Sequence, residues 1–319
     1  NGQLKNTGWE FHISTNKMIE SGKFYMDMNV NFGNNYNEIV ELEEAYLEQK
    51  NQTYDSPQNG KYMPLFQLHN PSGSIYGFRY KGVYQYSDYI AGEQENAPVA
   101  RDVNGNVITD EKGKPLPMMF NYGETNYEFQ GGDAIYEDIN HDGTIDELDI
   151  VYLGNSNPKI DGGFGTSVRY KRFTLNAFFN FRVGNKVINY GRMYAENMYS
   201  TDNQSKSVNW RWRMDGDLTT IPRALYQYGY NWLGSDRFVE DGSFLRMKQL
   251  TLNYSFDPQK LMKYRLRQLT LSLTLNNIFT VTNYSGADPE VSPNSIGISE
   301  DNNRTPRSRY FTFGINIGI

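Results

Sequence analysis

The stretch that most constrains the fold is residues 173–183, FTLNAFFNFRV, in which apolar and mostly polar side chains alternate. Successive side chains of a β-strand point to opposite faces, so this pattern predicts a strand with one apolar and one largely polar face. The apolar face must contact either a protein core or lipid, and that choice decides the class of protein. The apolar positions are Phe173, Leu175, Ala177, Phe179, Phe181 and Val183, and the others are Thr174, Asn176, Phe178, Asn180 and Arg182.

The same alternation recurs in residues 9–14, 24–32, 250–256, 269–276 and 310–319. The polar positions of these runs carry Asn, Thr, Ser, Asp and Gly, which suit a water-filled lumen, whereas charged residues concentrate in the connections. A soluble β-sandwich also alternates, but in it we would expect more Lys and Glu and shorter strands. Several runs reach the roughly 9–11 residues that a tilted strand needs to cross a bilayer, so the pattern favours a transmembrane β-barrel.

The connections between the predicted strands are alternately short and long. Outer-membrane barrels have short periplasmic turns and long extracellular loops, so the long connections are expected outside the cell. An open sheet would leave unpaired edges in lipid, so residues 1–319 are expected to form the C-terminal part of a larger, antiparallel, all-β barrel. The predicted strands are 7–19, 23–36, 61–69, 75–85, 158–170, 173–187, 242–257, 266–282 and 307–319, and the long loops lie near 37–61, 86–157, 188–237 and 284–306.

The composition excludes several functional classes. The chain has 319 residues, a net charge of −6 and no long basic run, so nucleic-acid binding has no electrostatic support. It contains no Cys, which removes disulfides, thiolate metal sites and cysteine nucleophiles. No apolar run approaches the roughly 18–20 residues of a membrane helix. Because the sequence also shows no phosphate-binding loop, nucleophile elbow or zinc-binding His pair, we expect no enzymatic activity.

One segment, DINHDGTIDELD at 138–149, fits the template of a calcium-binding loop. Gly143 stands where the template requires its sharp turn, and a helix is not expected before the loop. The segment therefore predicts a structural calcium site that stiffens the connection 86–157. The alternative is an Asx-rich turn closed by its own side-chain hydrogen bonds. The predicted ligands are Asp138, Asn140, Asp142, the carbonyl group of Thr144, Asp146 and Asp149.

The long connection 188–237 is unusually rich in aromatic residues and also carries arginines. Aromatic faces stack on sugar rings or receive peptide side chains, and Arg223 would hold a carboxylate. The same residues would equally serve as a small core of the loop or as a contact with a partner protein. The periodicity of 189–199 further predicts a short helix inside this connection. The candidate substrate-binding residues are Trp210, Trp212, Arg223, Tyr226, Tyr228, Tyr230 and Trp232.

Several stretches, in the same order, resemble the SusC/RagA-type TonB-dependent transporters of Bacteroidetes outer membranes. The resemblance implies a 22-stranded barrel plugged by an N-terminal domain. This chain would supply about the last nine strands, and the plug domain would not be in it. The stretches are GSIYGFRYKGVYQ (73–85), GDAIYEDINHDGTIDELD (132–149), LGNSNPKIDGGFG (153–165), FVEDGSFLRMKQLTLNYSF (238–256) and LTLNNIFTVTNYSGADPEV (273–291).

The resemblance also implies a function, namely active import of glycan oligosaccharides, or of peptides, across the outer membrane. A SusD-like surface lipoprotein would act as the lid, and outer-membrane lipid would surround the barrel. TonB would drive transport through an N-terminal region absent here. The alternative from the residues alone is a secreted, calcium-stabilised, β-rich binding module or adhesin, which would need no detergent to stay in solution.

Overall fold

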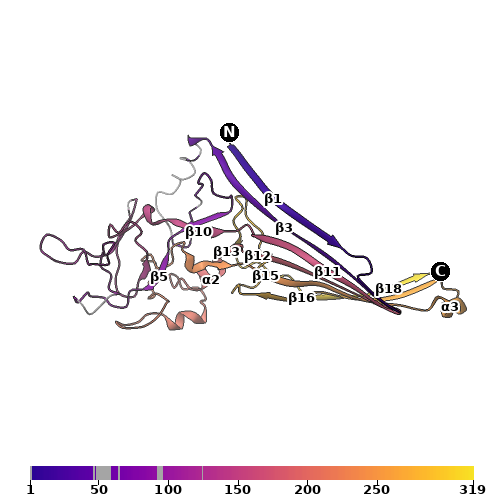
Figure 1. The fold of residues 1–319 in the computed structure, drawn as a ribbon. Coiled ribbons are helices and arrows are strands. Elements are labelled where there is room, and N and C mark those ends of the chain that lie inside the picture. The colour runs from indigo at the N-terminus through magenta and orange to yellow at the C-terminus, as the bar shows by residue number, and fades with distance from the viewer. Residues whose placement is uncertain (1, 46, 48–58, 64, 92–95, 124) are drawn as a thin grey trace.

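The computed structural model describes residues 2–45, 47, 59–63, 65–91, 96–123 and 125–319. Long antiparallel strands form a curved blade, and the connections at one end of this blade gather into a second body (Figure 1). We call the blade the main sheet and the second body, built from described residues of 43–159, 184–243 and 283–309, the loop region. Within the described residues, no helix combines the length and the apolar character needed to cross a membrane.

The main sheet is eight-stranded and antiparallel, and its strands follow the chain order. The strands of the main path are β1 (Gly2–Ser14), β3 (Phe24–Leu42), β11 (Ile160–Tyr170), β12 (Phe173–Val183), β15 (Phe244–Ser255), β16 (Gln268–Thr282) and β18 (Tyr310–Gly318). A short strand, β2 (Ile19–Ser21), pairs with β3 beside the first turn. Neighbouring strands are joined by short and long connections in alternation, because the loop region enters after β3, β12 and β16.

Two of the predicted barrel strands are wrong. Residues 75–85 form β4 (Ser74–Gly77) and β5 (Tyr80–Val83), which pair with β10 (Val151–Asn155) and β8 (Ala134–Tyr136) outside the main sheet. The described part of 61–69 contains only an isolated bridge, at Met63, and residue 64 lies outside the described residues. Both segments alternate like a membrane strand, but their partners are other parts of the loop region. The predicted loop 37–61 also begins later, because β3 continues to Leu42, and residues 46 and 48–58 of it lie outside the described residues.

The registers of the main sheet bring side chains of one kind into rows across the strands. One row joins Met26, Val168, Leu175, Leu252, Leu273 and Phe313, and another joins Val30, Phe164, Phe179, Met247 and Phe279. A β-bulge between Met247 and Gln249 restores the alternation after a shift of register. The opposite face carries the row Asp27, Ser167, Asn176, Thr251, Thr274 and Thr312.

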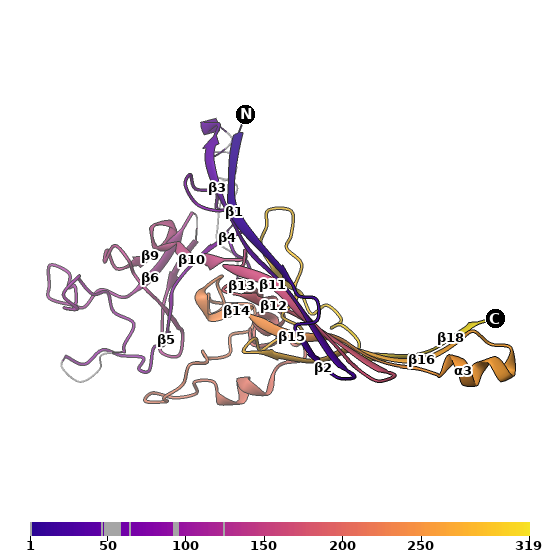
Figure 2. The ribbon, with the colours of Figure 1, turned by 45° about the vertical axis from the view of Figure 1, so that its right-hand side comes forward.

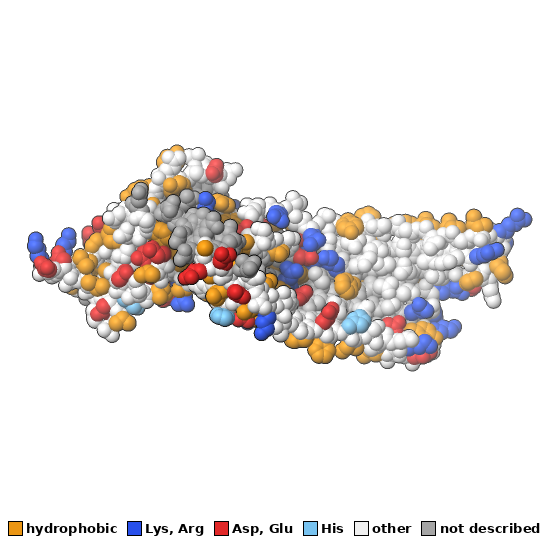
Figure 3. Space-filling model, turned by 90° about the horizontal axis from the view of Figure 1, so that it is seen from above, with side chains coloured by type: hydrophobic (Ala, Val, Ile, Leu, Met, Phe, Trp, Pro, Cys, Tyr) orange, Lys and Arg blue, Asp and Glu red, His pale blue; other side chains and the backbone are white. Residues whose placement is uncertain are grey.

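Polar, uncharged groups dominate one broad face of the main sheet. The strand part of Figure 3 is mostly white, the colour of backbone and uncharged polar side chains, and orange side chains gather along its long margins. Thr251 and Thr274 hydrogen-bond across this face at 3.0 Å. Among the described residues, only Ile39 and Phe244 of the main path belong to the buried apolar set, so no second layer covers the apolar rows.

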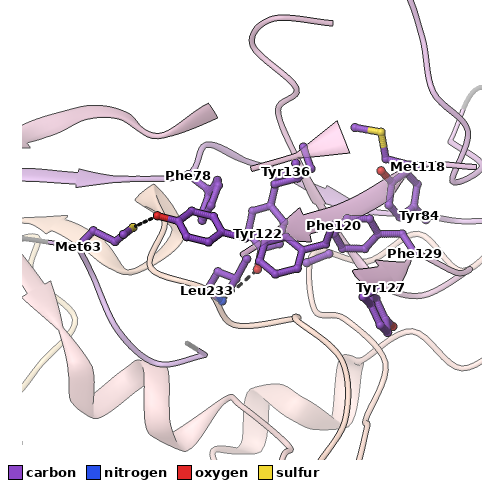
Figure 4. Close-up of a cluster of buried hydrophobic side chains, with 12 residues drawn as sticks. Met63, Phe78, Tyr84, Met118, Phe120, Tyr122, Tyr127, Phe129, Tyr136 and Leu233 are labelled. Carbon is purple, nitrogen blue, oxygen red and sulfur yellow. Dashed lines mark hydrogen bonds between the residues drawn. The ribbon is translucent and has the colours of Figure 1, made fainter. Parts of the chain in front are cut away.

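The loop region contains the buried cores of the molecule. The largest cluster includes Phe120, Phe129, Tyr136, Ile145 and Leu233, and several of its rings are labelled in Figure 4. It is assembled from β5, β8 and the small sheet of β6 (Met119–Tyr122), β7 (Thr125–Glu128) and β9 (Thr144–Ile145). Figure 2 shows these elements on the far side of the molecule from β18 and α3 (Pro258–Leu261).

A second cluster joins Ile75, Ile188, Met193 and Phe238. Met193 belongs to the helix α2 (Tyr190–Ala195), so the helix predicted within 189–199 is confirmed but is shorter. Beside it, β13 (Lys186–Asn189) pairs with β14 (Val239–Asp241) and with β17 (Glu300–Asp301). Three short 3₁₀ turns, η1 (Glu147–Asp149), η2 (Lys206–Trp210) and η3 (Asp236–Phe238), complete the loop region.

Candidate functional site

The apolar face of the main sheet has the height of a bilayer core. On β3 it extends from Phe24 to Phe32, nine residues that rise about 30 Å along the strand at roughly 3.3 Å per residue. At the strand tilt of about 40° usual in outer-membrane barrels, this corresponds to about 23 Å, close to the roughly 25 Å apolar band of such barrels. Within this height, the cross-strand rows on the apolar face of the described strands contain no charged side chain.

Aromatic rings mark both ends of this apolar band. At the end beside the loop region, Trp9, Phe11 and Phe32 contact one another with ring centroids 5.5–5.8 Å apart. At the end beside the short turns, Phe173 contacts Tyr254 at 4.8 Å. Aromatic girdles at the two membrane interfaces are typical of outer-membrane barrels. The arrangement therefore fits a sheet whose apolar face contacts lipid and whose polar face lines a lumen.

A buried guanidinium group ties the loop after β16 to the polar side of the sheet. Arg246 of β15 is 3% exposed, and it donates to Glu290 at 3.0 Å, to Asp288 and to the hydroxyl group of Thr280 at 2.9 Å. Lys248 and Arg307 also form ion pairs with Glu290. Burial alone would raise the pKa of Asp288, but the hydrogen bond from Arg246 and two backbone N–H groups hold it below its ordinary value. We call these five charged residues the Arg246 anchor.

The sequence motifs FLRMKQ and ADPEV contain four of the five residues of this anchor, all except Arg307, but the prediction of site residues missed them. Separated by about forty positions, they carry no local signal that they meet. The prediction of site residues also missed Asp133, which is completely buried. Asp133 receives hydrogen bonds from Tyr127 at 2.7 Å and from Arg223, 90 positions away, at 2.7 Å.

Four of the seven candidate substrate residues take part in the packing of the loop region. Arg223 pairs with Asp133, and the indole N–H group of Trp212 donates to the carbonyl group of Gln85 at 3.2 Å. Tyr230 packs on Phe120 with ring centroids 4.4 Å apart. Trp232 contacts the rings of Tyr194 and Tyr199. These four side chains contribute to the packing of the loop region, and their contact with substrate stays a prediction.

The other three candidates present their rings to the surface. Trp210 is 77% exposed, Tyr226 66% and Tyr228 60%. Met214 and Leu218, in the same segment, are 65% and 85% exposed. An apolar ring held at the surface of a structured loop is suited to contact a ligand or a partner protein. Substrate contact by these three residues stays a prediction.

The predicted calcium-binding loop is folded around its own backbone amides. Asp138 accepts from the N–H group of Gly143 at 2.8 Å, Asp142 from that of Thr144 at 2.8 Å, and Asp149 from that of Ile139 at 2.7 Å. Asp146 caps η1, and its own N–H group donates to Asp149 at 2.9 Å. Asn140 donates its side-chain amide to Asp142 at 2.8 Å.

Two of these carboxylates lie in the interior of the loop. Asp138 is 9% exposed and Asp149 is completely buried. Burial raises the pKa of Asp149 to about 6, and the nearby charges of Asp138 and Asp146 act in the same direction. Within the described residues, no group of three or more His, Asp or Glu side chains is arranged so that it could hold a metal ion. The predicted ligand set also includes the side-chain amide of Asn140 and the carbonyl group of Thr144.

Comparisons with known proteins agree with this geometry. No family model matches the chain. The TonB-dependent receptor P39 of Formosa agariphila is 27% identical over 337 residues, which cover 99% of this chain and 30% of the receptor. The TonB-dependent receptor SusC of Bacteroides thetaiotaomicron is 27% identical over 322 residues, which cover 99% of this chain and 26% of that protein. The chain thus spans less than a third of the length of these relatives.

Solved structures with the same fold include that of the RagAB peptide transporter. One of its chains superimposes with a TM-score of 0.66 and 22% identity over the whole of this chain and 30% of its own length. The RagAB peptide importer in its "closed-closed" state gives a TM-score of 0.65. The main sheet is therefore a segment of an outer-membrane barrel, as its two faces indicate. The chain is homologous to the SusC/RagA-type TonB-dependent receptors of the outer membrane and corresponds to part of their β-barrel.

Proposed function

We propose that the protein imports oligosaccharides or peptides across the outer membrane, with a surface lipoprotein as the lid and TonB as the source of energy. The observation that carries the proposal is the main sheet, which has an uncovered apolar face at bilayer height and a polar face rich in Asn, Thr and Ser. Such a sheet separates lipid from a wet passage. Its relatives are receptors of the TonB-dependent class, and one fold neighbour is a peptide transporter.

The loop region would form the outer mouth of the passage. Its long connections all emerge at the same end of the sheet, whereas the short turns and α3 lie at the other end (Figures 1 and 2). The exposed apolar side chains between Trp210 and Tyr228 support a contact with ligand or with the lipoprotein at this mouth. The buried cores beneath them would hold that surface in a fixed shape.

A secreted binding module is the alternative function, and the uncovered apolar rows argue against it. Large apolar patches on a soluble monomer are costly and promote aggregation. The two functions differ in one simple property. The full-length protein should stay monodisperse only in detergent or lipid, and a monodisperse, detergent-free preparation would favour the secreted module.

Growth of the host bacterium tests the import function and its substrate class together. A strain that lacks the gene for the full-length protein should lose growth on one class of nutrient, either oligosaccharides or peptides, when that class is the sole source. Growth should return with the intact gene. The control is growth on a monosaccharide or on free amino acids, which should be unaffected. Unchanged growth on every oligosaccharide and peptide tested would contradict the proposal.

A further inference from the structure

We propose that residues 138–149 bind one calcium ion, and that this ion holds the largest core cluster of the loop region in its folded form. Calcium binding at this loop would be independent of what the receptor transports. One carboxylate oxygen of Asp138, Oδ2, accepts a hydrogen bond from the N–H group of Gly143, but the other, Oδ1, is buried and has no hydrogen-bond partner.

A buried carboxylate oxygen without a partner is unfavourable, since it has lost water and gained nothing in exchange. Asp138, Asp142, Asp146 and Asp149 lie within twelve residues, and in the described structure none of them forms an ion pair with Lys or Arg. Like charges so close repel one another unless a cation lies between them. A bound cation would therefore provide the partner that Asp138 lacks and remove the repulsion.

The oxygen groups present match calcium better than other common cations. Calcium prefers six to eight hard oxygen ligands in an adaptable arrangement, and carboxylates, an amide and a backbone carbonyl are the groups this loop offers. Nitrogen and sulfur ligands, which zinc prefers, are lacking in the predicted set. Asn140 now donates its amide N–H to Asp142, so the ion would replace that hydrogen bond and turn the Asn140 oxygen inward.

The tight turn of the loop requires glycine at position 143. Gly143 has φ +86, and a Cβ atom there would lie 2.6 Å from the Cβ atom of Ala100. A side chain is therefore excluded both by the left-handed backbone and by the contact. The turn also places the N–H groups of Gly143 and Thr144, which donate to Asp138 and Asp142.

The loop is joined directly to the core. The carbonyl group of Gly143 accepts from the N–H group of Met119, and β9 pairs with β6 in parallel. Ile145, one residue after Thr144, is completely buried in the largest cluster. An ion that fixes 138–149 therefore also fixes the edge of that cluster, and its removal should loosen β6, β8 and β9 and leave the main sheet intact.

The test uses the full-length receptor in detergent micelles, freed of divalent ions and titrated with calcium chloride by calorimetry. One saturable site is expected. Asp138→Asn should weaken calcium binding at least about tenfold, and Asp142→Asn, at an exposed position, should also weaken it without risk to folding. Asn140→Asp should strengthen binding about fivefold, because it adds a charged ligand at an exposed position.

The matched control is Asp110→Asn. Asp110 closes a similar turn by accepting from the N–H groups of Lys112 and Lys114 at 2.8 Å, but it lies outside the predicted calcium-binding loop. Its variant should bind calcium like the unaltered receptor. Hydrogen exchange should show calcium-dependent protection at 119–145 and none in the main sheet. Absence of saturable binding, or equal affinities for Asn140→Asp, Asp142→Asn and the control, would overturn the proposal in favour of a self-closed Asx turn.

Discussion

The main sheet and the loop region use the same apolar side chains in opposite ways. In the main sheet Phe, Leu and Ile stand in cross-strand rows and stay open on one face, with Phe313 59% and Ile315 58% exposed. In the loop region Phe120, Phe129 and Ile145 are at most 1% exposed. The first region relies on an outside apolar solvent, whereas the second makes its own interior. The difference teaches that mean hydropathy does not report which residues are buried, and the following variants test it.

The largest effect is expected from Phe120→Ala in the core of the loop region. Removing a fully buried ring should lower the local free energy of unfolding by about 3–5 kcal/mol. Hydrogen exchange of the full-length receptor should show faster exchange in the loop region and no change in the main sheet. Val103→Ala, at a side chain 73% exposed, is the control and should change little. Equal loss of protection in both regions would show that they unfold as one unit.

The next effect is expected from Leu250→Arg, which places a charge among the apolar rows near mid-height of the main sheet. An arginine facing lipid near the bilayer midplane costs about 2–4 kcal/mol. The amount of assembled receptor in outer membranes should fall. The neighbouring Thr251→Arg, on the polar face, is the matched control and should assemble normally. If the two variants assembled equally, the assignment of the faces would be wrong.

A smaller effect is expected from Arg246→Met, which keeps an unbranched apolar stem and removes the charged guanidinium group. It leaves Asp288 and Glu290 without their main partner, and because both are partly solvated we expect a local loss of about 2 kcal/mol. Hydrogen exchange should accelerate in 283–309 alone. Lys248→Met, at a half-exposed side chain, should cost under about 0.5 kcal/mol. The opposite ranking of these two variants would refute the anchor.

Trp210→Ala and Trp212→Ala separate surface from packing within one segment. Trp212 packs over Gly132 and donates to Gln85, so its loss should lower the stability of the loop region by about 1–2 kcal/mol. Trp210 is exposed, so its variant should stay within about 0.5 kcal/mol and weaken binding of ligand or lipoprotein instead. Thermal unfolding and co-purification of the lipoprotein measure the two effects. If the Trp210→Ala variant bound ligand and lipoprotein as well as the unaltered protein, the proposed contact through Trp210 would be wrong.

The smallest effect concerns pH and the Arg246 anchor. The pKa of Asp288 is lower in the folded protein than its ordinary 3.8, so its ionised form stabilises the anchor at every pH above that value. This stabilisation is lost only as the pH falls through the folded pKa. Hydrogen exchange in 283–309 should therefore be equally protected at about pH 7 and about pH 5, after correction for the intrinsic rate. A marked loss of protection between these two values would contradict the assignment.

Prediction from the sequence succeeded where one strand was enough to define the pattern. The alternation around Phe179 and Asn176 has a period of two, which can be recognised from residues 173–183 alone, without knowledge of the neighbouring strands. Both side chains lie on the predicted faces of the sheet. It failed at 61–69 and 75–85, because Tyr76 alternates in the same way but pairs with β10 inside the loop region. The short helix at Tyr190 was predicted, and its ends were not.

The sequence by itself determined the two-faced strands, the alternation of short and long connections and the order of oxygen-bearing residues in 138–149. These features depend on neighbours along the chain. Only the tertiary structure decided that Arg246 meets Asp288, that Arg223 neutralises the buried Asp133 and that Asp138 keeps one oxygen without a partner. Such contacts join residues distant in sequence, or depend on burial, and the free energy of each is set by packing that no single segment contains.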